Sequence, residues 1–270
     1  MTKYSKEKEQ EILKFYNQGK SISEIAKYYN SYNTSIKRVL NRNGIFYNLT
    51  KSEQRTSVKI NPFMDLKNPE VQYWLGMIVT DGNVYKNRIS LDCGEKDVEH
   101  LKKYHQFTKT TNIINKSLSK QFNTYQYSVR FKNEEIAKYL ISLGIYENKS
   151  YTVKVNFPIT YDFLRGVIDG DGCIEIKKDS KKLYISIVTA SEDFKNQLSN
   201  FLTLNNYKHG IYKAKNHNVI NISAKKDVVK LCYNLYNNST LFLERKKAKY
   251  LIHLNNLGLD EMTVANFWQH

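Results

Sequence analysis

Two short segments of the sequence are nearly alike, and each ends in an acidic residue followed by glycine. The first is residues 74–82 (WLGMIVTDG) and the second is residues 164–172 (LRGVIDGDG). Each is an apolar run with helical character and with Gly at its third position. If the two helices pack side by side, the carboxylates of Asp81 and Asp171 meet at their ends. Paired carboxylates are ligands for a hard divalent cation, and such a cation activates water for hydrolysis.

The chain of 270 residues carries a large positive charge. Lys and Arg total 42 against 26 Asp and Glu, which gives a formal net charge of +16. A surplus of this size attracts polyanions and releases counterions on binding, although a solvated basic surface is the alternative explanation. Twin carboxylates on such a chain predict metal-dependent cleavage of nucleic acid, with an activity that falls steeply as salt rises.

Cysteine usage and hydropathy narrow the class of protein further. Cys93, Cys173 and Cys232 lie far apart with no Cys-x-x-Cys pair, so neither a disulfide framework nor a structural zinc site is expected. No apolar run approaches the roughly 18 residues that a membrane-spanning helix needs, and no signal peptide begins the chain. We therefore expect no membrane partner and a cytoplasmic protein associated with the DNA of a nucleoid or an organelle.

Two helices are expected to position the carboxylates. Asn68-Pro69-Glu70 is a good helix start, with Asn as the cap and Pro in the first turn, and the second helix is expected to begin near Thr160. Gly76 and Gly166 occupy the same place in the two helices, although a mid-helix Gly costs about 1 kcal/mol relative to Ala. Close approach of the two helix backbones explains both glycines.

The residues after each helix repeat one order of elements. Gly82 and Gly172 are expected to end the helices in the left-handed conformation. Strands are predicted at 82–87 and 88–93, with two more ending near 125–131, and at 172–177 and 183–189, with two more ending near 219–224; helices are predicted at 95–107, 133–143, 191–204 and 226–236. The pattern predicts an α+β fold, a pseudo-symmetric tandem αββαββα repeat in which each sheet has helices on one face and an open, concave, polar face. The copies are expected to span residues 68–158 and 159–256, before a C-terminal tail at residues 257–270.

The first 44 residues predict a small all-α module. Helices are expected at residues 6–18, from Ser21, and at about 33–43; Gly19 ends the first, and Ser21 with Glu24 forms a capping-box pattern. The arrangement resembles a helix-turn-helix, whose third helix would present Tyr32, Asn33, Ser35, Lys37 and Arg38 to a major groove. A plain three-helix bundle with a polar face is the alternative. Residues 45–67 are predicted to be a linker.

The two motifs, with their matching strand order, resemble the paired motifs of the LAGLIDADG homing endonucleases. The resemblance covers about residues 69–256, and the second motif is the closer match. It implies that the last acid of each motif, Asp81 and Asp171, binds Mg²⁺ or Mn²⁺ at the helix interface. It also implies that the backbone carbonyls of Thr80 and Gly170 face the same ions.

The resemblance assigns further roles near the motifs. Val79 replaces the acid often found at the sixth motif position, whereas Asp169 keeps it; this position is not a metal ligand in the family, so activity does not require it. The family also places a basic residue near the cleft to stabilise charge on the phosphate. Lys149 and Lys246 occupy similar places after the two copies, and an ordinary contact with the DNA backbone is the alternative for each.

Base recognition is expected on the open faces of the sheets. Alternation nominates Tyr85, Asn87, Arg88, Ser90, Asp92, Ser128 and Arg130 in the first copy, and Glu175, Lys177, Tyr184, Ser186, Asn221 and Ser223 in the second. Lys213 and Lys215 are expected to contact phosphate. Because the two halves differ in these side chains, the target is not expected to be a perfect palindrome.

The resemblance implies a monomeric, site-specific endonuclease that cuts both strands of a long, asymmetric double-stranded DNA site and has no obligate protein partner. Three alternatives stay open: a transcriptional regulator that binds DNA without cutting, an RNA maturase that assists intron splicing, and a nickase. Because position 1 is neither Cys nor Ser and no Asn ends the chain, a free-standing enzyme is expected and not an intein.

Overall fold

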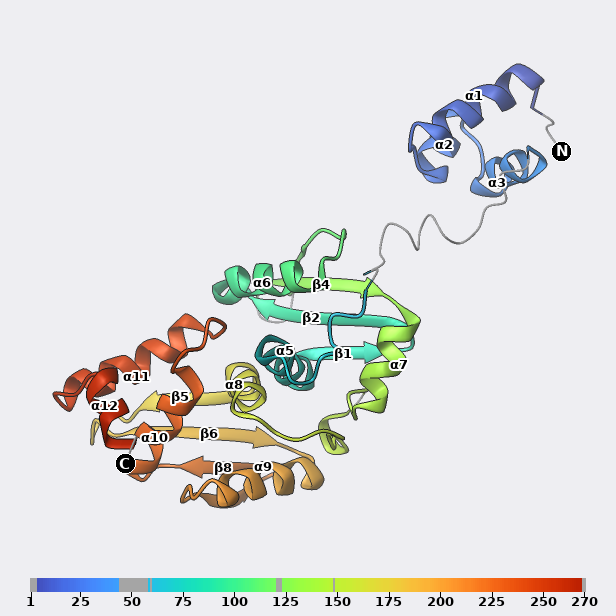
Figure 1. Cartoon of the computed structure of the whole chain (residues 1–270). Helices are drawn as coiled ribbons and strands as arrows, with labels where there is room; N and C mark the ends of the chain where they lie inside the picture. Colours follow the sequence, from blue (N-terminus) through green and yellow to red (C-terminus); the bar gives the residue numbers. More distant parts are fainter. Residues whose placement is uncertain (1–3, 44–57, 59, 120–122, 148, 269–270) are drawn as a thin grey trace. The chain divides into compact units, whose positions relative to one another are not determined.

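The computed structural model describes residues 4–43, 58, 60–119, 123–147 and 149–268. Contacts between residues divide the chain into two compact units, Met1–Arg55 and Thr56–His270 (Figure 1). In the described part of the chain, no helix is both long enough and apolar enough to cross a membrane.

The N-terminal unit is the three-helix module that the sequence predicts. It consists of α1 (Lys6–Asn17), α2 (Ile22–Tyr28) and α3 (Asn33–Arg42), packed around a small apolar core. Gly19 follows α1 with a φ of +88°, and the capping box of Ser21 and Glu24 forms at the start of α2. At the start of α3, the Tyr32 side chain is 81% exposed, which leaves this end of the helix accessible to a ligand.

The second unit contains two copies of one pattern of helices and strands. The first copy consists of α5 (Pro69–Thr80), β1 (Gly82–Tyr85), β2 (Arg88–Gly94), η1 (Glu95–Asp97), α6 (Val98–Thr108), β3 (Asn115–Ser119), β4 (Thr124–Lys132), α7 (Glu134–Ser142) and η2 (Lys149–Tyr151). The second consists of α8 (Tyr161–Gly170), β5 (Gly172–Ile176), β6 (Leu183–Thr189), α9 (Glu192–Leu204), β7 (Gly210–Ala214), β8 (His217–Ile222) and α10 (Lys225–Tyr236).

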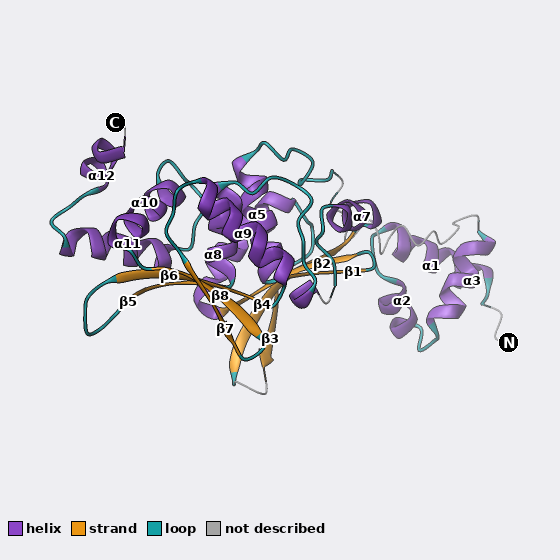
Figure 2. Ribbon diagram, turned by 90° about the horizontal axis from the view of Figure 1, so that it is seen from below, coloured by secondary structure: helices purple, strands orange, loops and turns teal. Residues whose placement is uncertain are grey.

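Both sheets have the same topology. The strand orders are β1-β2-β4-β3 and β5-β6-β8-β7, and every neighbouring pair is antiparallel. In Figure 2, most helices of the second unit lie on one side of its strands. The predicted α+β tandem repeat is therefore confirmed.

Alternation along the inner strands explains which face of each sheet packs under the helices. On β2, Ile89 and Leu91 are at most 1% exposed, and on β6, Ile185 and Ile187 are fully buried. Successive side chains of a strand point to opposite faces. The residues between these apolar ones therefore lie on the other face of each sheet, away from the helices.

The described part of the predicted linker packs on the first copy. Val58 and Phe63 are 2% and 0% exposed and belong to the main core, and Asn133 donates a hydrogen bond from Nδ2 to the carbonyl of Val58 at 3.0 Å. Residues 44–57 and 59 lie outside the described residues. Val58 and the described residues from 60 onward are thus part of the second unit. The weak periodicity of residues 45–67 did not indicate this packing.

Two helices follow the second copy. They are α11 (Glu244–Asn256), which packs against β5 and α10, and α12 (Glu261–Trp268), which packs against α10. The segment expected to be a C-terminal tail therefore contains a packed helix, in which Val264 is 1% exposed. α11 matters for the site because it carries Arg245 and Lys246.

Candidate functional site

Helices α5 and α8 lie with their backbones in contact. A Cβ atom added at Gly76 would lie 2.3 Å from the carbonyl oxygen of Phe163 and 2.9 Å from the Cα atom of Gly166. A Cβ atom added at Gly166 would lie 2.1 Å from the carbonyl oxygen of Tyr73. Side chains at these two positions are excluded by main-chain atoms, so the glycines set how closely the helices approach.

Gly82 and Gly172, which follow the motif acids, are required for a different physical reason from the one predicted. Asp81 and Asp171 cap α5 and α8 with ordinary right-handed backbone angles, and neither Gly82 nor Gly172 is among the described glycines with positive φ. A Cβ atom at either glycine would lie 2.6 Å from the Cα atom four residues earlier. The prediction of a left-handed helix end was wrong, because these glycines are needed for space where the strand leaves the helix.

The two carboxylates converge at the seam between the helices. A Cβ atom added at Gly170 would lie 3.2 Å from Oδ2 of Asp81 and 1.9 Å from Oγ1 of Thr80, so the end of α5 touches the end of α8. Burial, and then the charge of Asp171, raises the pKa of Asp81 to about 6. Burial also raises the pKa of Asp171, against the opposing effect of the lysines nearby.

This arrangement fits a divalent cation with hard oxygen ligands. Both carboxylates are exposed to solvent on one side, and the pKa of each is raised. A cation bound between them would stabilise their ionised forms. In the described residues, no three His, Cys, Asp or Glu side chains gather into a metal-binding cluster. Backbone carbonyls and water would therefore complete the coordination, which is how Mg²⁺ is commonly held.

Two buried lysines brace the ends of the motif helices. Lys149 donates from Nζ to the carbonyl of Gly82 at 2.5 Å, and Lys246 donates to the carbonyl of Gly172 at 2.7 Å. Their exposed fractions are 7% and 3%. Burial lowers the pKa of both, that of Lys246 to about 8, while the nearby aspartates oppose the change. Both lysines therefore lie at the ends of the motif helices, and the role at the phosphate that the sequence order suggests for them stays a prediction.

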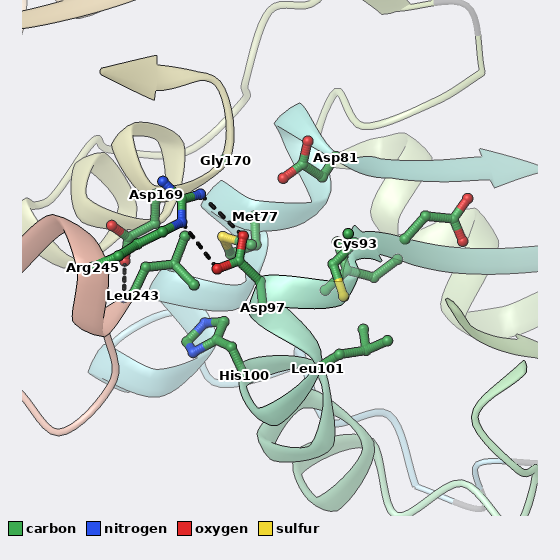
Figure 3. Close-up of a pocket in the computed structure, with 13 residues that line it drawn as sticks. Met77, Asp81, Cys93, Asp97, His100, Leu101, Asp169, Gly170, Leu243 and Arg245 are labelled. Carbon is green, nitrogen blue, oxygen red and sulfur yellow. Dashed lines mark hydrogen bonds and ion pairs between the residues drawn. The ribbon is translucent and has the colours of Figure 1, made fainter. Parts of the chain in front are cut away.

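A cavity lies on each side of the paired acids. The Asp81 cavity, of about 230 Å³, is lined among others by Asp81, Asp92, Cys93, Asp97, His100 and Arg245 (Figure 3). The Asp171 cavity, of about 410 Å³, is lined among others by Asp171, Lys149, Ser150, Thr189, Phe194 and His217. The helix ends are alike, but the side chains that surround them differ strongly in charge.

Asp169 ties the second motif helix to the start of α11. Its Oδ2 atom accepts hydrogen bonds from the Tyr73 hydroxyl at 2.9 Å and from the Leu243 N–H at 2.8 Å. His100 Nε2 lies 2.6 Å from the same hydroxyl. The single proton of the Tyr73 hydroxyl goes to Asp169, so the Nε2–H of His100 donates to the Tyr73 oxygen. Burial lowers the pKa of His100 to about 4. In the first motif, Val79 occupies the position of Asp169 and has no carboxylate. The hydrogen bonds that Asp169 accepts from Tyr73 and Leu243 therefore have no counterpart in the first half.

Replacing Asp169 tests this tether. Asp169→Val removes the acceptor of a buried backbone N–H, which costs about 1–3 kcal/mol, whereas Asp169→Asn keeps an acceptor oxygen. We expect the Asn variant to be more stable than the Val variant by about that amount. Urea unfolding measures the difference, and hydrogen exchange of the Leu243 amide, faster in the Val variant, locates it. Equal stability and exchange in the two variants would show that Asp169 does not hold α11 in place.

Strand register places most of the nominated base-contacting residues on one face of each sheet. In the first sheet, Tyr85 pairs with Arg88, Ser90 with Arg130, and Asp92 with Ser128. In the second, Glu175 pairs with Tyr184 and Ser186 with Asn221. Asn87, Lys177 and Ser223 lie just beyond strand ends, and all three are exposed.

Several nominated residues are placed less favourably. Ser90 and Ser128 lie on inner strands and are only 7% and 4% exposed, so these short side chains offer little surface to a ligand. Lys213 pairs with Asn218 and so lies on the face opposite Asn221, although it is exposed at the sheet edge, as Lys215 is in the following turn. On α3, Arg38 and Asn33 are exposed, whereas Ser35 and Lys37 are half-buried.

Three residues of this site were not nominated from the sequence: Asp97, His100 and Arg245. Arg245 donates from Nε and Nη2 to the two carboxylate oxygens of Asp97, both at 3.0 Å. The two residues are 148 positions apart, and no local pattern connects them. Asp169 was noticed as a motif acid, but its bond to a backbone N–H on another element leaves no trace in the sequence.

Comparison with known proteins identifies the fold. Residues 160–236 match the family model of the LAGLIDADG-like domain. The chain is similar to the homing endonuclease I-WcaI bound to its DNA recognition sequence, with 18% identity, a TM-score of 0.53, and coverage of 75% of this chain and 92% of that one. It is also similar to the I-LtrWI LAGLIDADG homing endonuclease bound to target DNA, with 13% identity, a TM-score of 0.50, and coverage of 74% and 96%.

A third similar structure is the N-terminal LAGLIDADG domain of DUF199/WhiA, with 14% identity, a TM-score of 0.46, and coverage of 72% of this chain and 95% of that one. No curated protein matches the chain. At these identities the two homing endonuclease structures show the fold alone, and the predicted resemblance to the LAGLIDADG homing endonucleases is confirmed at the level of the fold.

Proposed function

We propose that this chain, which has the LAGLIDADG homing endonuclease fold, is a site-specific endonuclease that hydrolyses phosphodiester bonds in both strands of DNA. One observation carries the proposal: two partly desolvated carboxylates, one from each half, converge at the glycine-lined seam of α5 and α8. The net charge of +16 supports a polyanionic substrate. A protein that only binds DNA gains nothing from placing two acids together beside phosphates.

The carboxylates of Asp81 and Asp171, with the backbone carbonyls of Thr80 and Gly170, would hold Mg²⁺ or Mn²⁺. The cation would activate water and offset charge on the phosphate. Lys149 and Lys246 donate to the carbonyls that follow the acids. They thereby fix the ends of both motif helices and offset the negative charge gathered there.

The polar faces of the two sheets would bind the DNA duplex. Arg88, Arg130 and Lys177 are exposed there, and Arg contacts guanine or phosphate in a bidentate manner. Because the second sheet pairs Glu175 with Tyr184 where the first pairs Tyr85 with Arg88, the target is expected to be asymmetric. The N-terminal unit would extend the footprint through the exposed residues of α3, including Arg38.

Selection from a DNA library tests the proposal even though the target sequence is not specified in advance. The purified full chain is incubated with Mg²⁺ and a pool of randomised duplexes, and both new ends of every broken molecule are sequenced. We expect breaks with short 3′ overhangs at one long, non-palindromic sequence. Enrichment of one bound sequence without breaks would indicate a regulator, breaks in one strand a nickase, and tight intron-RNA binding without DNA cleavage a maturase.

The raised pKa of Asp81 predicts how metal binding depends on pH. Below a pH of about 6 this carboxyl is protonated in the folded protein, so Mg²⁺ affinity is expected to fall about tenfold per pH unit there. Isothermal titration calorimetry with Mg²⁺, from a pH of about 5 to a pH of about 8, measures the trend on both sides of this pKa. A flat affinity across this interval would contradict the role of Asp81 as a ligand.

The raised pKa of Asp81 also predicts how the stability of the metal-free protein depends on pH. The folded state keeps a proton on Asp81 that the unfolded state has lost between the ordinary value of 3.8 and about 6. Stability from this group therefore decreases as pH rises through that interval and stays lower above it. At neutral pH, Asp81→Asn is expected to melt above the wild type without metal, and added Mg²⁺ is expected to raise the melting temperature of the wild type only.

A further inference from the structure

The basic residues near the two cavities are not equivalent. Lys149 lines the Asp171 cavity, and the one hydrogen bond that its ammonium makes to the described residues goes to the carbonyl of Gly82. Lys246 does not line the Asp81 cavity. Its Nζ atom lies within 2.7 Å of the carbonyl oxygens of Ile168, Asp169 and Gly172. An ammonium group has three N–H donors, so these carbonyls use all the donors of Lys246.

Arg245, the neighbour of Lys246 on α11, is the cationic side chain that lines the Asp81 cavity. Its Nε and Nη2 atoms each donate to a carboxylate oxygen of Asp97 at 3.0 Å, and Figure 3 shows this pair beside Asp81 and Gly170. A guanidinium group has five N–H donors, of which Asp97 takes two. The Arg245 side chain is 47% exposed, against 21% for Asp97, so the remaining donors are accessible from the cavity.

We propose that Arg245, held in place by Asp97, contacts the scissile phosphate of the strand that enters the Asp81 cavity, whereas Lys149 serves the strand at the Asp171 cavity. The inference rests on the proposed function, since it assigns side chains to the two strand-cutting sites. Lys246 is then a positioning residue, which holds the end of α8 and the start of β5 through its carbonyl contacts, the longest of them to Gly170 at 3.5 Å, and does not touch the phosphate.

The physical basis is preorganisation of charge. A guanidinium already fixed by a two-pronged ion pair needs no reorientation when negative charge builds up on a phosphate, and its planar shape suits two phosphate oxygens at once. Lys149 supplies a compact charge without that geometry. The two strands are therefore cut by sites of different chemistry on one pseudo-symmetric frame.

Strand-resolved kinetics tests this assignment. The selected target is labelled with a different fluorophore on each strand, and single-turnover nicking of each strand is followed with Mg²⁺. Arg245→Met is expected to slow nicking of one strand by about a hundredfold and to leave the other within about threefold of wild type. Lys149→Met is expected to slow the opposite strand. Asp97→Asn, which weakens the hold on Arg245, is expected to slow the Arg245 strand to an intermediate degree.

Controls separate this inference from folding and from the proposed function. Lys102→Ala removes an ion pair with Glu99 on the outer surface of α6 and is expected to leave both strands unaffected. Arg245→Lys keeps a positive charge but cannot form the bidentate pair with Asp97. If Arg245→Met does not fold, this variant is expected to slow nicking of the same strand about tenfold. Equal slowing of both strands by Arg245→Met, or no slowing, overturns the assignment. A wild-type chain that cuts neither strand of any duplex overturns the proposed function instead.

Discussion

Asp171→Asn is expected to abolish cleavage of both DNA strands while DNA binding persists. Asp171 and Asp81 meet at one seam, so the loss of either carboxylate weakens the coordination of cations that serve both cavities. Metal ions contribute several kcal/mol to the stabilisation of such transition states, and each 1.36 kcal/mol is a factor of ten in rate. We expect the rate to fall by about a thousandfold or more, measured in single-turnover assays with saturating enzyme.

DNA affinity without metal provides the companion measurement. Removing a negative charge beside phosphates is expected to leave the affinity unchanged or slightly tighter, which a folding defect would not do. Asp193→Asn is a matched control, because Asp193 is an exposed carboxylate in the first turn of α9 and lies outside both cavities. Cleavage by Asp171→Asn at the wild-type rate would remove the paired acids from the mechanism.

Gly76→Val is expected to unfold the second unit at ordinary temperature. The added Cβ atom alone would lie 2.3 Å from one backbone oxygen of α8 and 2.8 Å from a backbone nitrogen, and backbone atoms cannot turn aside as a side chain does. Overpacking typically costs about 1–3 kcal/mol, and a main-chain clash at the central helix pair is expected to exceed that range. Domains are stable by only about 5–15 kcal/mol, so a loss of this size is decisive.

Trp74 reports on this change directly. It lies two residues before Gly76 and is fully buried, so its fluorescence is expected to shift to longer wavelength in the variant. Gly210→Ala is the matched control, because a Cβ atom there meets nothing within 4 Å and Gly210 has no positive φ. A Gly76→Val variant that melts like the wild type would show that the two helices separate at no cost.

Short-range patterns in the sequence were sufficient for most elements of the two copies and for placing the motif acids at the ends of α5 and α8, but not for α12 in the expected tail. The cap at Asn68 and Pro69, the capping box at Ser21 and the alternation along each strand are decided by residues only a few positions apart. The repeat of one motif after ninety residues then implied two similar halves, and the mid-helix glycines implied close contact between them. Each of these inferences rests on spacing, which a chain carries before it folds.

The surroundings of the acids depend on contacts between distant segments. Asp97 meets Arg245 across 148 positions, and Asp169 meets the Leu243 N–H across 74; both follow from where the start of α11 is placed by its packing against β5 and α10. Gly82 is required because a side chain there would collide with the preceding helix turn, not because of its backbone angles. Lys246 contacts backbone carbonyls because its side chain is buried among them, which its residue type alone does not determine. Such features are set by which elements meet and how tightly, and no periodicity or local spacing along one segment encodes the atoms that a remote segment will bring to it.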